Sequence, residues 1–147
     1  MKDNDSPDEY RWSFQEGFDE QATEFLRDRI TEYNFATTNT YDGKGLTMCV
    51  RDKDDRIVAG IDGWTWGQCL FIQSLWVRED LRLKGYGGRL LQATEKEAIS
   101  RGCHQSLLDT HSFQAPGFYK KYGYEVVGVA NNYPVGYQHL HMRKSLG

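Results

Sequence analysis

The sequence predicts one α/β domain in which helices flank a mixed, mostly antiparallel sheet. Helical patterns alternate with short apolar runs along most of the chain. Three apolar runs between residues 46 and 77 are separated only by tight turns, which is typical of an antiparallel meander. A helical pattern then precedes the next apolar run, as in a parallel crossover. The predicted order is β-α-β-β-β-α-β-α-β-β.

Composition narrows the class of protein. The 147 residues fit a single domain, and 27% charged with 39% hydrophobic residues suits a soluble globular protein. The net charge of −3 argues against a general affinity for nucleic acid. The chain has no apolar run of membrane-spanning length, and its polar start is no signal peptide. The three cysteines lack metal-ligand spacing and are expected to be reduced, so we expect a cytoplasmic protein.

The first part of the chain is expected to hold a strand and a helix. Residues 1–9 read as a frayed tail, so the predicted domain spans residues 10–147. Residues 10–14 alternate aromatic and polar side chains, which predicts a strand. Asp19 is a suitable N-cap for a helix that should end near Asn34. Residues 35–44 are rich in Thr, Asn, Asp and Gly and are predicted to form a loop.

The meander and the elements after it follow from local patterns. Residues 46–51 and 57–67 flank a polar hairpin turn, and residues 70–77 form the third strand. The helix over residues 87–101 should bury Leu90, Leu91, Thr94 and Ala98, and should turn Gln92, Glu95, Lys96 and Glu97 toward water. Further elements are expected as a strand over 106–110, a short helix over 116–121, and strands over 125–129 and 137–143.

The stretch from residue 75 to residue 91 passes from a strand through a glycine-rich turn into a helix. Gly85, Gly87 and Gly88 let the backbone approach a ligand closely. The free N–H groups at the helix start favour an anion. Three cations, Arg82, Lys84 and Arg89, lie in or beside the glycine-rich turn. It therefore predicts a cradle for a diphosphate, although it is neither a P-loop nor a dinucleotide fingerprint.

Two signatures resemble those of the GCN5-related N-acetyltransferases, the GNAT family. The spacing Arg82-x-x-Gly85-x-Gly87 resembles the family's loop for the pyrophosphate of coenzyme A. Residues 115–124 resemble its Ala-x-x-Phe-Tyr-x-Lys-x-Gly-Phe/Tyr segment. With the order of elements, the resemblance covers residues 10–144 and indicates a small, single-domain member of bacterial type.

The resemblance implies acetyl-CoA as co-substrate and no metal. The backbone of residues 75–77 is expected to bind the pantetheine and acetyl groups, with the amide of Trp76 or Val77 polarising the thioester carbonyl. Many members carry Asn where this chain has Ser112, so the role of Ser112 is open. The expected cofactor-binding residues are Leu75, Trp76, Val77, Arg82, Lys84, Gly85, Tyr86, Gly87, Gly88, Arg89, Ser112, Phe118 and Tyr119.

Two residues are predicted to be catalytic. Tyr119 matches the family tyrosine that protonates the departing thiolate, and a phenol with a pKa of about 10 suits that role. Tyr119 could instead orient the cofactor or belong to an aromatic cluster. For the general base we name Glu79, with Asp62, Asp109 and His111 as rivals.

The acceptor site is expected beside the predicted strand over residues 57–67. Tyr33 and Asn34 would contribute from the first helix. Asp62, Trp64 and Trp66 alternate onto one face of a strand, and aromatic walls beside a carboxylate suit a small cationic amine. The same pattern fits a covered sheet face or a dimer contact.

His139 and His141 share one face of the last predicted strand. Two histidines at this spacing can bind a metal ion. Because no acidic or thiol residue lies near them in the sequence, we predict an exposed strand face and no metal ligand.

The expected function is acetyl transfer from acetyl-CoA to the primary amine of a small molecule by direct attack on the thioester. Acetylation of a protein lysine or N-terminus, and a non-catalytic acyl-CoA sensor, are the alternatives. We expect neither nucleic acid nor membrane as a partner. A homodimer is common in the family, but the sequence leaves the acceptor, the acyl-chain preference and the oligomeric state open.

Overall fold

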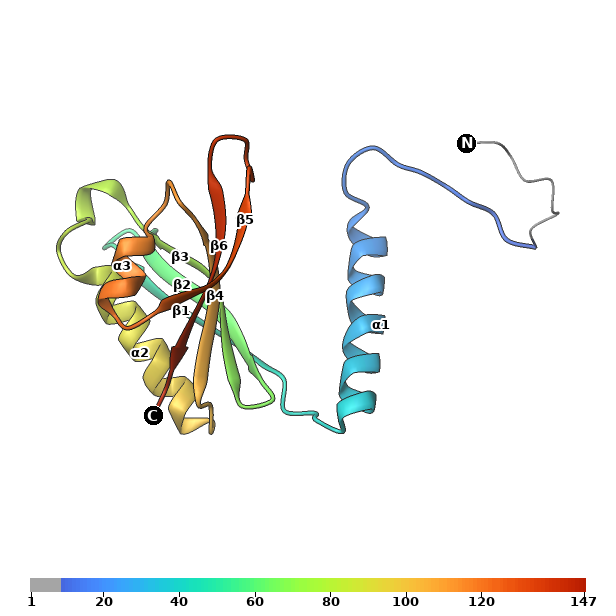
Figure 1. Ribbon diagram of the computed structural model, residues 1–147, viewed down its shortest axis with the longest axis horizontal. Coiled ribbons are helices and arrows are strands. Elements are labelled where there is room, and N and C mark those ends of the chain that lie inside the picture. Colours follow the sequence, from blue (N-terminus) through green and yellow to red (C-terminus); the bar gives the residue numbers. More distant parts are fainter. Residues whose placement is uncertain (1–8) are drawn as a thin grey trace. The chain divides into compact units, whose positions relative to one another are not determined.

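The structure is a computed structural model that describes residues 9–147. The chain divides into two compact units, Met1–Asn39 and Thr40–Gly147. Most of the tail predicted over residues 1–9 therefore lies outside the described residues. Each unit is described by itself below (Figure 1).

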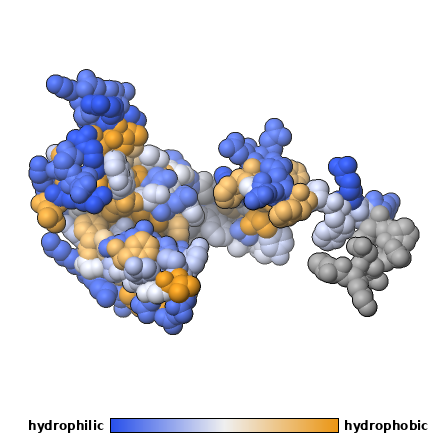
Figure 2. All heavy atoms as spheres, turned by 90° about the horizontal axis from the view of Figure 1, so that it is seen from above, coloured by the Kyte–Doolittle hydropathy of each residue, from blue (hydrophilic) through white to orange (hydrophobic). Residues whose placement is uncertain are grey.

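The first unit contains helix α1, Glu20–Thr38. Asp19 caps it as predicted, because its side chain accepts a hydrogen bond of 3.0 Å from the Ala22 amide. The predicted end near Asn34 is wrong by one turn. The helix continues to Thr38 and stops at Asn39, which adopts a left-handed conformation with φ 52°. Its apolar side chains lie at the surface (Figure 2).

The strand predicted over residues 10–14 is absent from the described chain. This segment is irregular, and Tyr10, Trp12 and Phe14 are 75%, 86% and 94% exposed. A strand needs a neighbour for its N–H and C=O groups, and the described part of the first unit offers only a helix. Alternation alone therefore gave a wrong prediction here.

The second unit is built on a six-stranded mixed sheet in the order β1-β2-β3-β4-β6-β5. Its strands are β1 (Lys44–Arg51), β2 (Ile57–Trp66), β3 (Cys69–Val77), β4 (Gln105–His111), β5 (Glu125–Asn131) and β6 (Gln138–Ser145). Only β3 and β4 pair in parallel, as the predicted crossover requires. The predicted α/β class and the mostly antiparallel sheet are confirmed (Figure 1).

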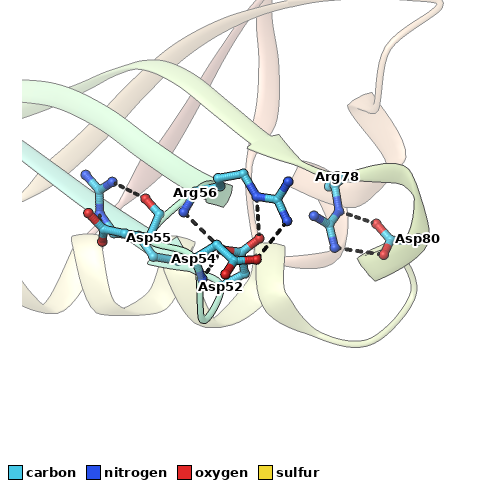
Figure 3. A network of polar contacts seen from close by, with 7 residues as sticks. Asp52, Asp54, Asp55, Arg56, Arg78 and Asp80 are labelled. Carbon is cyan, nitrogen blue, oxygen red and sulfur yellow. Dashed lines mark hydrogen bonds and ion pairs between the residues drawn. The ribbon is translucent and has the colours of Figure 1, made fainter.

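The hairpin turn between β1 and β2 is organised by Asp52. Its carboxylate accepts hydrogen bonds from the amides of Asp54 and Arg56. It also forms an ion pair of 3.0 Å with the Arg56 side chain (Figure 3). The bond from the Arg56 amide, with the other contacts, lowers the pKa of Asp52. The turn predicted from its charged residues is thus held by those charges.

Helix α2, Tyr86–Ser100, packs on the sheet and builds the core. Its buried face matches the predicted one at Leu90, Leu91, Thr94 and Ala98. These side chains meet apolar residues of the strands, including Leu70, Leu108 and Met142. Burial of this apolar surface stabilises the second unit.

The prediction that Glu95 of α2 faces water is wrong. It is 6% exposed and forms an ion pair of 2.6 Å with Lys144 of β6. Its other oxygen lies 3.4 Å from the hydroxyl of Tyr124, which donates to Ser106 at 2.8 Å. A buried carboxylate needs such partners, and helical periodicity alone does not reveal one that β6 supplies.

Two short helices complete the second unit. The 3-10 helix η1 covers Glu79–Leu81 and was not predicted. Helix α3 covers Pro116–Lys121, as predicted. All three cysteines are free, and only Cys103 is fully buried. Within residues 9–147, every helix is too short or too polar to cross a bilayer.

Candidate active site

Strands β3 and β4 separate beyond the half in which they pair. The parallel ladder joins residues 69–72 to residues 105–108 and ends there, although β3 continues to Val77 and β4 to His111. A cavity of about 590 Å³ lies at this opening. Its lining includes Leu75, Val77, Arg82, Leu108, Asp109, Thr110, Ala115 and Tyr119.

The backbone of Leu75 and Val77 faces this opening. The Arg78 amide donates to the carbonyl of Val58 on β2 at 2.9 Å. In an antiparallel strand, every second residue directs its N–H and C=O to the same neighbour. Trp76 therefore turns its backbone toward β2, where it is paired with Gly60. Of the two amides predicted to polarise a thioester, the one at Val77 points toward the opening between β3 and β4.

A second cavity of about 460 Å³ lies against the glycine loop. Gly85 precedes α2 with φ 86°, a conformation that favours glycine. The first amides of α2, at Tyr86, Gly87 and Gly88, have no partner within the helix. Among the described residues, no side chain caps them. They are thus available to an anionic ligand, with the helix dipole in support.

Gly87 and Gly88 are also required by packing. A Cβ at Gly88 would overlap the hydroxyl of Tyr122 and lie 2.7 Å from its Cζ. A Cβ at Gly87 would lie 3.3 Å from Cζ of Phe118. The glycines therefore let α3 and its C-cap approach the start of α2 while leaving the amides of α2 accessible.

The cations around the loop have different surroundings. Arg78 forms two hydrogen bonds with Asp80, of 2.6 and 2.9 Å, which lower the pKa of Asp80 (Figure 3). Arg82 donates from Nε to the Val77 carbonyl at 3.0 Å, so it ties the loop to the end of β3. Lys84 and Arg89 are exposed, and neither lines the cavity between β3 and β4 or the cavity at the glycine loop.

Tyr119 lines both cavities, which also share Leu75, Val77, Arg82 and Ala115. The two cavities therefore adjoin. Burial raises the pKa of Tyr119 above its ordinary value. Its hydroxyl consequently keeps its proton at neutral pH and can donate it.

A third cavity of about 270 Å³ adjoins the first at Ser74 and Trp76, which line both. Asp62 lies in this third cavity, and its Oδ1 is buried without a hydrogen-bond partner among the described residues. A buried carboxylate oxygen without a donor is costly. Beside the ring of Trp76, it is suited to receive a cationic donor.

Other predicted acceptor residues have different contacts. Trp64 stacks on Phe71 with ring centroids 4.8 Å apart. The indole N–H of Trp66 donates to the Thr40 carbonyl at 3.0 Å. Neither tryptophan lines the Asp62 cavity. Tyr33 and Asn34 belong to the first unit, so their predicted role is untested.

Two further predicted residues lie outside these cavities. Glu79 is exposed on η1, whereas its rival Asp109 lines the 590 Å³ cavity between β3 and β4. The hydroxyl of Ser112 accepts a bond of 2.9 Å from the Gln138 amide and so joins the end of β4 to β6. Sequence reasoning missed Ser74, because a lone serine in an apolar strand carries no signal until register places it between two cavities.

Known proteins share this architecture. The family model described as "Acetyltransferase (GNAT) family" matches residues 7–124. Acetyltransferase Atu2258 of Agrobacterium fabrum is 33% identical over 110 residues, which cover 75% of this chain and 80% of that protein. Blasticidin-S acetyltransferase of Streptomyces morookaense is 37% identical over 81 residues, 54% of this chain and 60% of that one. An acetyltransferase structure from Bacillus cereus superposes with a TM-score of 0.75 at 32% identity, covering 90% and 97% of the two chains.

Proposed function

The chain belongs to the acetyltransferase (GNAT) family, and we propose that it acetylates the primary amine of a small molecule by direct attack on the thioester of acetyl-CoA. One observation carries this proposal. The glycine-loop cavity, the cavity between β3 and β4, and the Asp62 cavity adjoin in that order through shared lining residues. A diphosphate, a thioester and an amine would fit these three cavities in that order.

The proposed co-substrate site uses mainly backbone groups. The diphosphate binds the amides of Tyr86, Gly87 and Gly88 at the start of α2. The pantetheine arm lies between β3 and β4, where Leu75 and Val77 offer backbone groups that β4 does not pair. Arg82 supports the site indirectly, since its bond to the Val77 carbonyl fixes the end of β3.

The proposed chemistry needs a polarised carbonyl, a neutral amine and a protonated leaving group. The Val77 amide donates to the thioester oxygen as negative charge develops there. The amine nitrogen bonds to the carbonyl carbon, the carbon–sulfur bond breaks, and Tyr119 protonates the thiolate. Glu79 stays a prediction for the base, and its exposed position on η1 requires relay of the amine proton through water.

The acceptor is proposed to be a small amine with a second cationic group. The unpartnered Oδ1 of Asp62 would pair with this cation, while Trp76 and Ser74 line the path to the thioester. Similarity to a protein named blasticidin-S acetyltransferase supports a small-molecule acceptor over a protein lysine or N-terminus.

Thiol release from acetyl-CoA, measured across a panel of monoamines and diamines, tests this proposal. We expect turnover with at least one amine, and a fall of about 10²–10⁴-fold in kcat for Tyr119→Phe. Tyr137→Phe is the control, because it also removes a phenol hydroxyl but lies outside the lining of all three cavities. Tight coenzyme A binding without turnover on any amine would favour the sensor alternative instead.

Asp62→Asn separates the acceptor site from the co-substrate site. We expect a higher KM for diamines and an unchanged Kd for coenzyme A, because Asp62 lies in the cavity remote from the glycine loop. An unchanged preference between diamines and monoamines would contradict the role given to Asp62.

A further inference from the structure

A cluster of three side chains lies on the sheet face opposite α2. Asp109 comes from β4, and His139 and His141 come from β6. The register pairs Asp109 directly with His141. Nδ1 of His141 lies 2.5 Å from Oδ1 of Asp109, and Nε2 of His139 lies 3.6 Å from Oδ2. One ligand atom from each residue fits within a span of 4.8 Å.

The prediction that the two histidines lack an acidic partner is wrong. Strand β4 places Asp109 beside them, although it is 32 residues from His141 along the chain. The next residues on both strands, including Leu108, Leu140 and Met142, turn to the buried face. The three polar side chains therefore share a face by strand alternation.

Neighbouring residues hold the two imidazoles in place. The ring of Tyr133 stacks on that of His139 with centroids 5.3 Å apart and an interplanar angle of 6°. The absence of a side chain at Gly128 makes room for His141, since a Cβ there would lie 3.2 Å from its Cδ2. Nε2 of His139 is buried and has no hydrogen-bond partner in the described chain. A buried polar atom in this state favours a ligand that can bind it.

We propose that Asp109, His139 and His141 bind a divalent transition-metal ion, with Zn²⁺ as the best fit. Two imidazoles and one carboxylate suit Zn²⁺ and Co²⁺, whereas Mg²⁺ and Ca²⁺ prefer oxygen ligands. Ligand atoms around tetrahedral zinc lie about 3.3 Å apart, so small side-chain rotations bring the three atoms to bonding distance. A fourth position stays open to water or another ligand.

Coordination would fix the tautomer of His141. Coordination through Nδ1 requires that nitrogen to be free of its proton, so the neutral ring carries its proton on Nε2. The contact between His141 and Asp109 is then replaced by bonds from both residues to the ion. Asp109 also lines the 590 Å³ cavity, so the ion would lie beside the opening between β3 and β4.

Metal binding is tested on the full chain without an affinity tag, made metal-free with a chelator and kept reduced. Calorimetric titration with Zn²⁺ is expected to give one equivalent bound, with no comparable binding of Mg²⁺. Asp109→Asn and His141→Ala are each expected to weaken Zn²⁺ binding by roughly tenfold or more, because loss of a residue that only hydrogen-bonds to a metal ligand already weakens binding by about that factor. His104→Ala is the matched control and should leave the affinity unchanged, because His104 lies outside the cluster.

The Co²⁺ complex gives a second, independent readout. We expect a visible absorption spectrum of nitrogen and oxygen ligation. Asp109→Asn should change this spectrum and raise the Co²⁺ concentration needed to reach it, with circular dichroism showing that this conservative variant is folded. A thiolate charge-transfer band would place the ion on a cysteine and overturn the assignment. So would equal Zn²⁺ binding by wild type and both cluster variants, or no saturable binding. Since these measurements use neither acetyl-CoA nor an amine, they succeed or fail independently of the proposed function.

Discussion

Replacing Gly88 by alanine tests whether the glycine loop is shaped by packing as well as by its ligand. The added methyl group would overlap the hydroxyl of Tyr122 and lie 2.7 Å from Cζ. Overpacking of this kind costs about 1–3 kcal/mol. Alanine is favoured over glycine in a helix by about 1 kcal/mol. We therefore expect Gly88→Ala to lower the free energy of unfolding by up to about 2 kcal/mol.

Combining Gly88→Ala with Tyr122→Ala should reverse the sign of its effect. With the ring removed, only the helical preference remains, so the added methyl group should stabilise by up to about 1 kcal/mol. The coupling energy in this double-mutant cycle is then about 1–3 kcal/mol. Urea denaturation of the four proteins measures it. Gly117→Ala is the control, because a Cβ at that helical glycine contacts nothing within 4 Å.

Equal effects of Gly88→Ala in the presence and absence of the Tyr122 ring would refute this reasoning. The overlap would then be relieved by a rotation of the ring that costs nothing, and packing would place no demand on Gly88. A loss of coenzyme A binding without a loss of stability would show instead that the methyl group acts on the ligand.

Lys144→Met leaves Glu95 buried without its partner and is expected to lower the free energy of unfolding by about 3 kcal/mol. Adding Glu95→Leu should recover most of this loss in urea denaturation. Because burial raises the pKa of Tyr119 above its ordinary value, its hydroxyl should lose its proton at a higher pH than a free tyrosine does. The ratio of wild-type to Tyr119→Phe rates of thiol release should therefore be constant through the neutral range and fall only in strongly alkaline solution. Gly63→Ala would overlap a backbone oxygen of β3 and should sharply lower the melting temperature, whereas Gly45→Ala should not.

Most of the fold could be predicted because its signals are local. Glycines end α2 and α3 at Gly102 and Gly123, where φ is 85° and 93°, and the sequence marks both. The predicted elements from residue 46 onward match the observed ones within two residues. The errors concern properties that depend on a partner. Residues 10–14 have the pattern of a strand but no neighbouring strand among the described residues of their unit.

The sequence predicts only those parts of the site whose backbone conformation is set by a local motif. The position of the glycine loop at the start of α2 is such a feature. The direction of the amides at Trp76 and Val77 depends on the pairing of β3 with β2, which the sequence does not reveal. The role of Ser112 stays open. Its hydroxyl accepts from the Gln138 amide, a contact that depends on the path of β6 and that the sequence does not reveal.

The three glycines of the loop show why one short motif can be so informative. Gly85 is needed for a positive φ, Gly87 for its distance from Phe118, and Gly88 for its contact with Tyr122. Only the first requirement is local. The other two tie the loop to the aromatic segment about thirty residues later, which is the second signature of the family resemblance. In this chain the two signatures form one packed unit, in which the residues that close α3 onto α2 also leave the helix amides accessible.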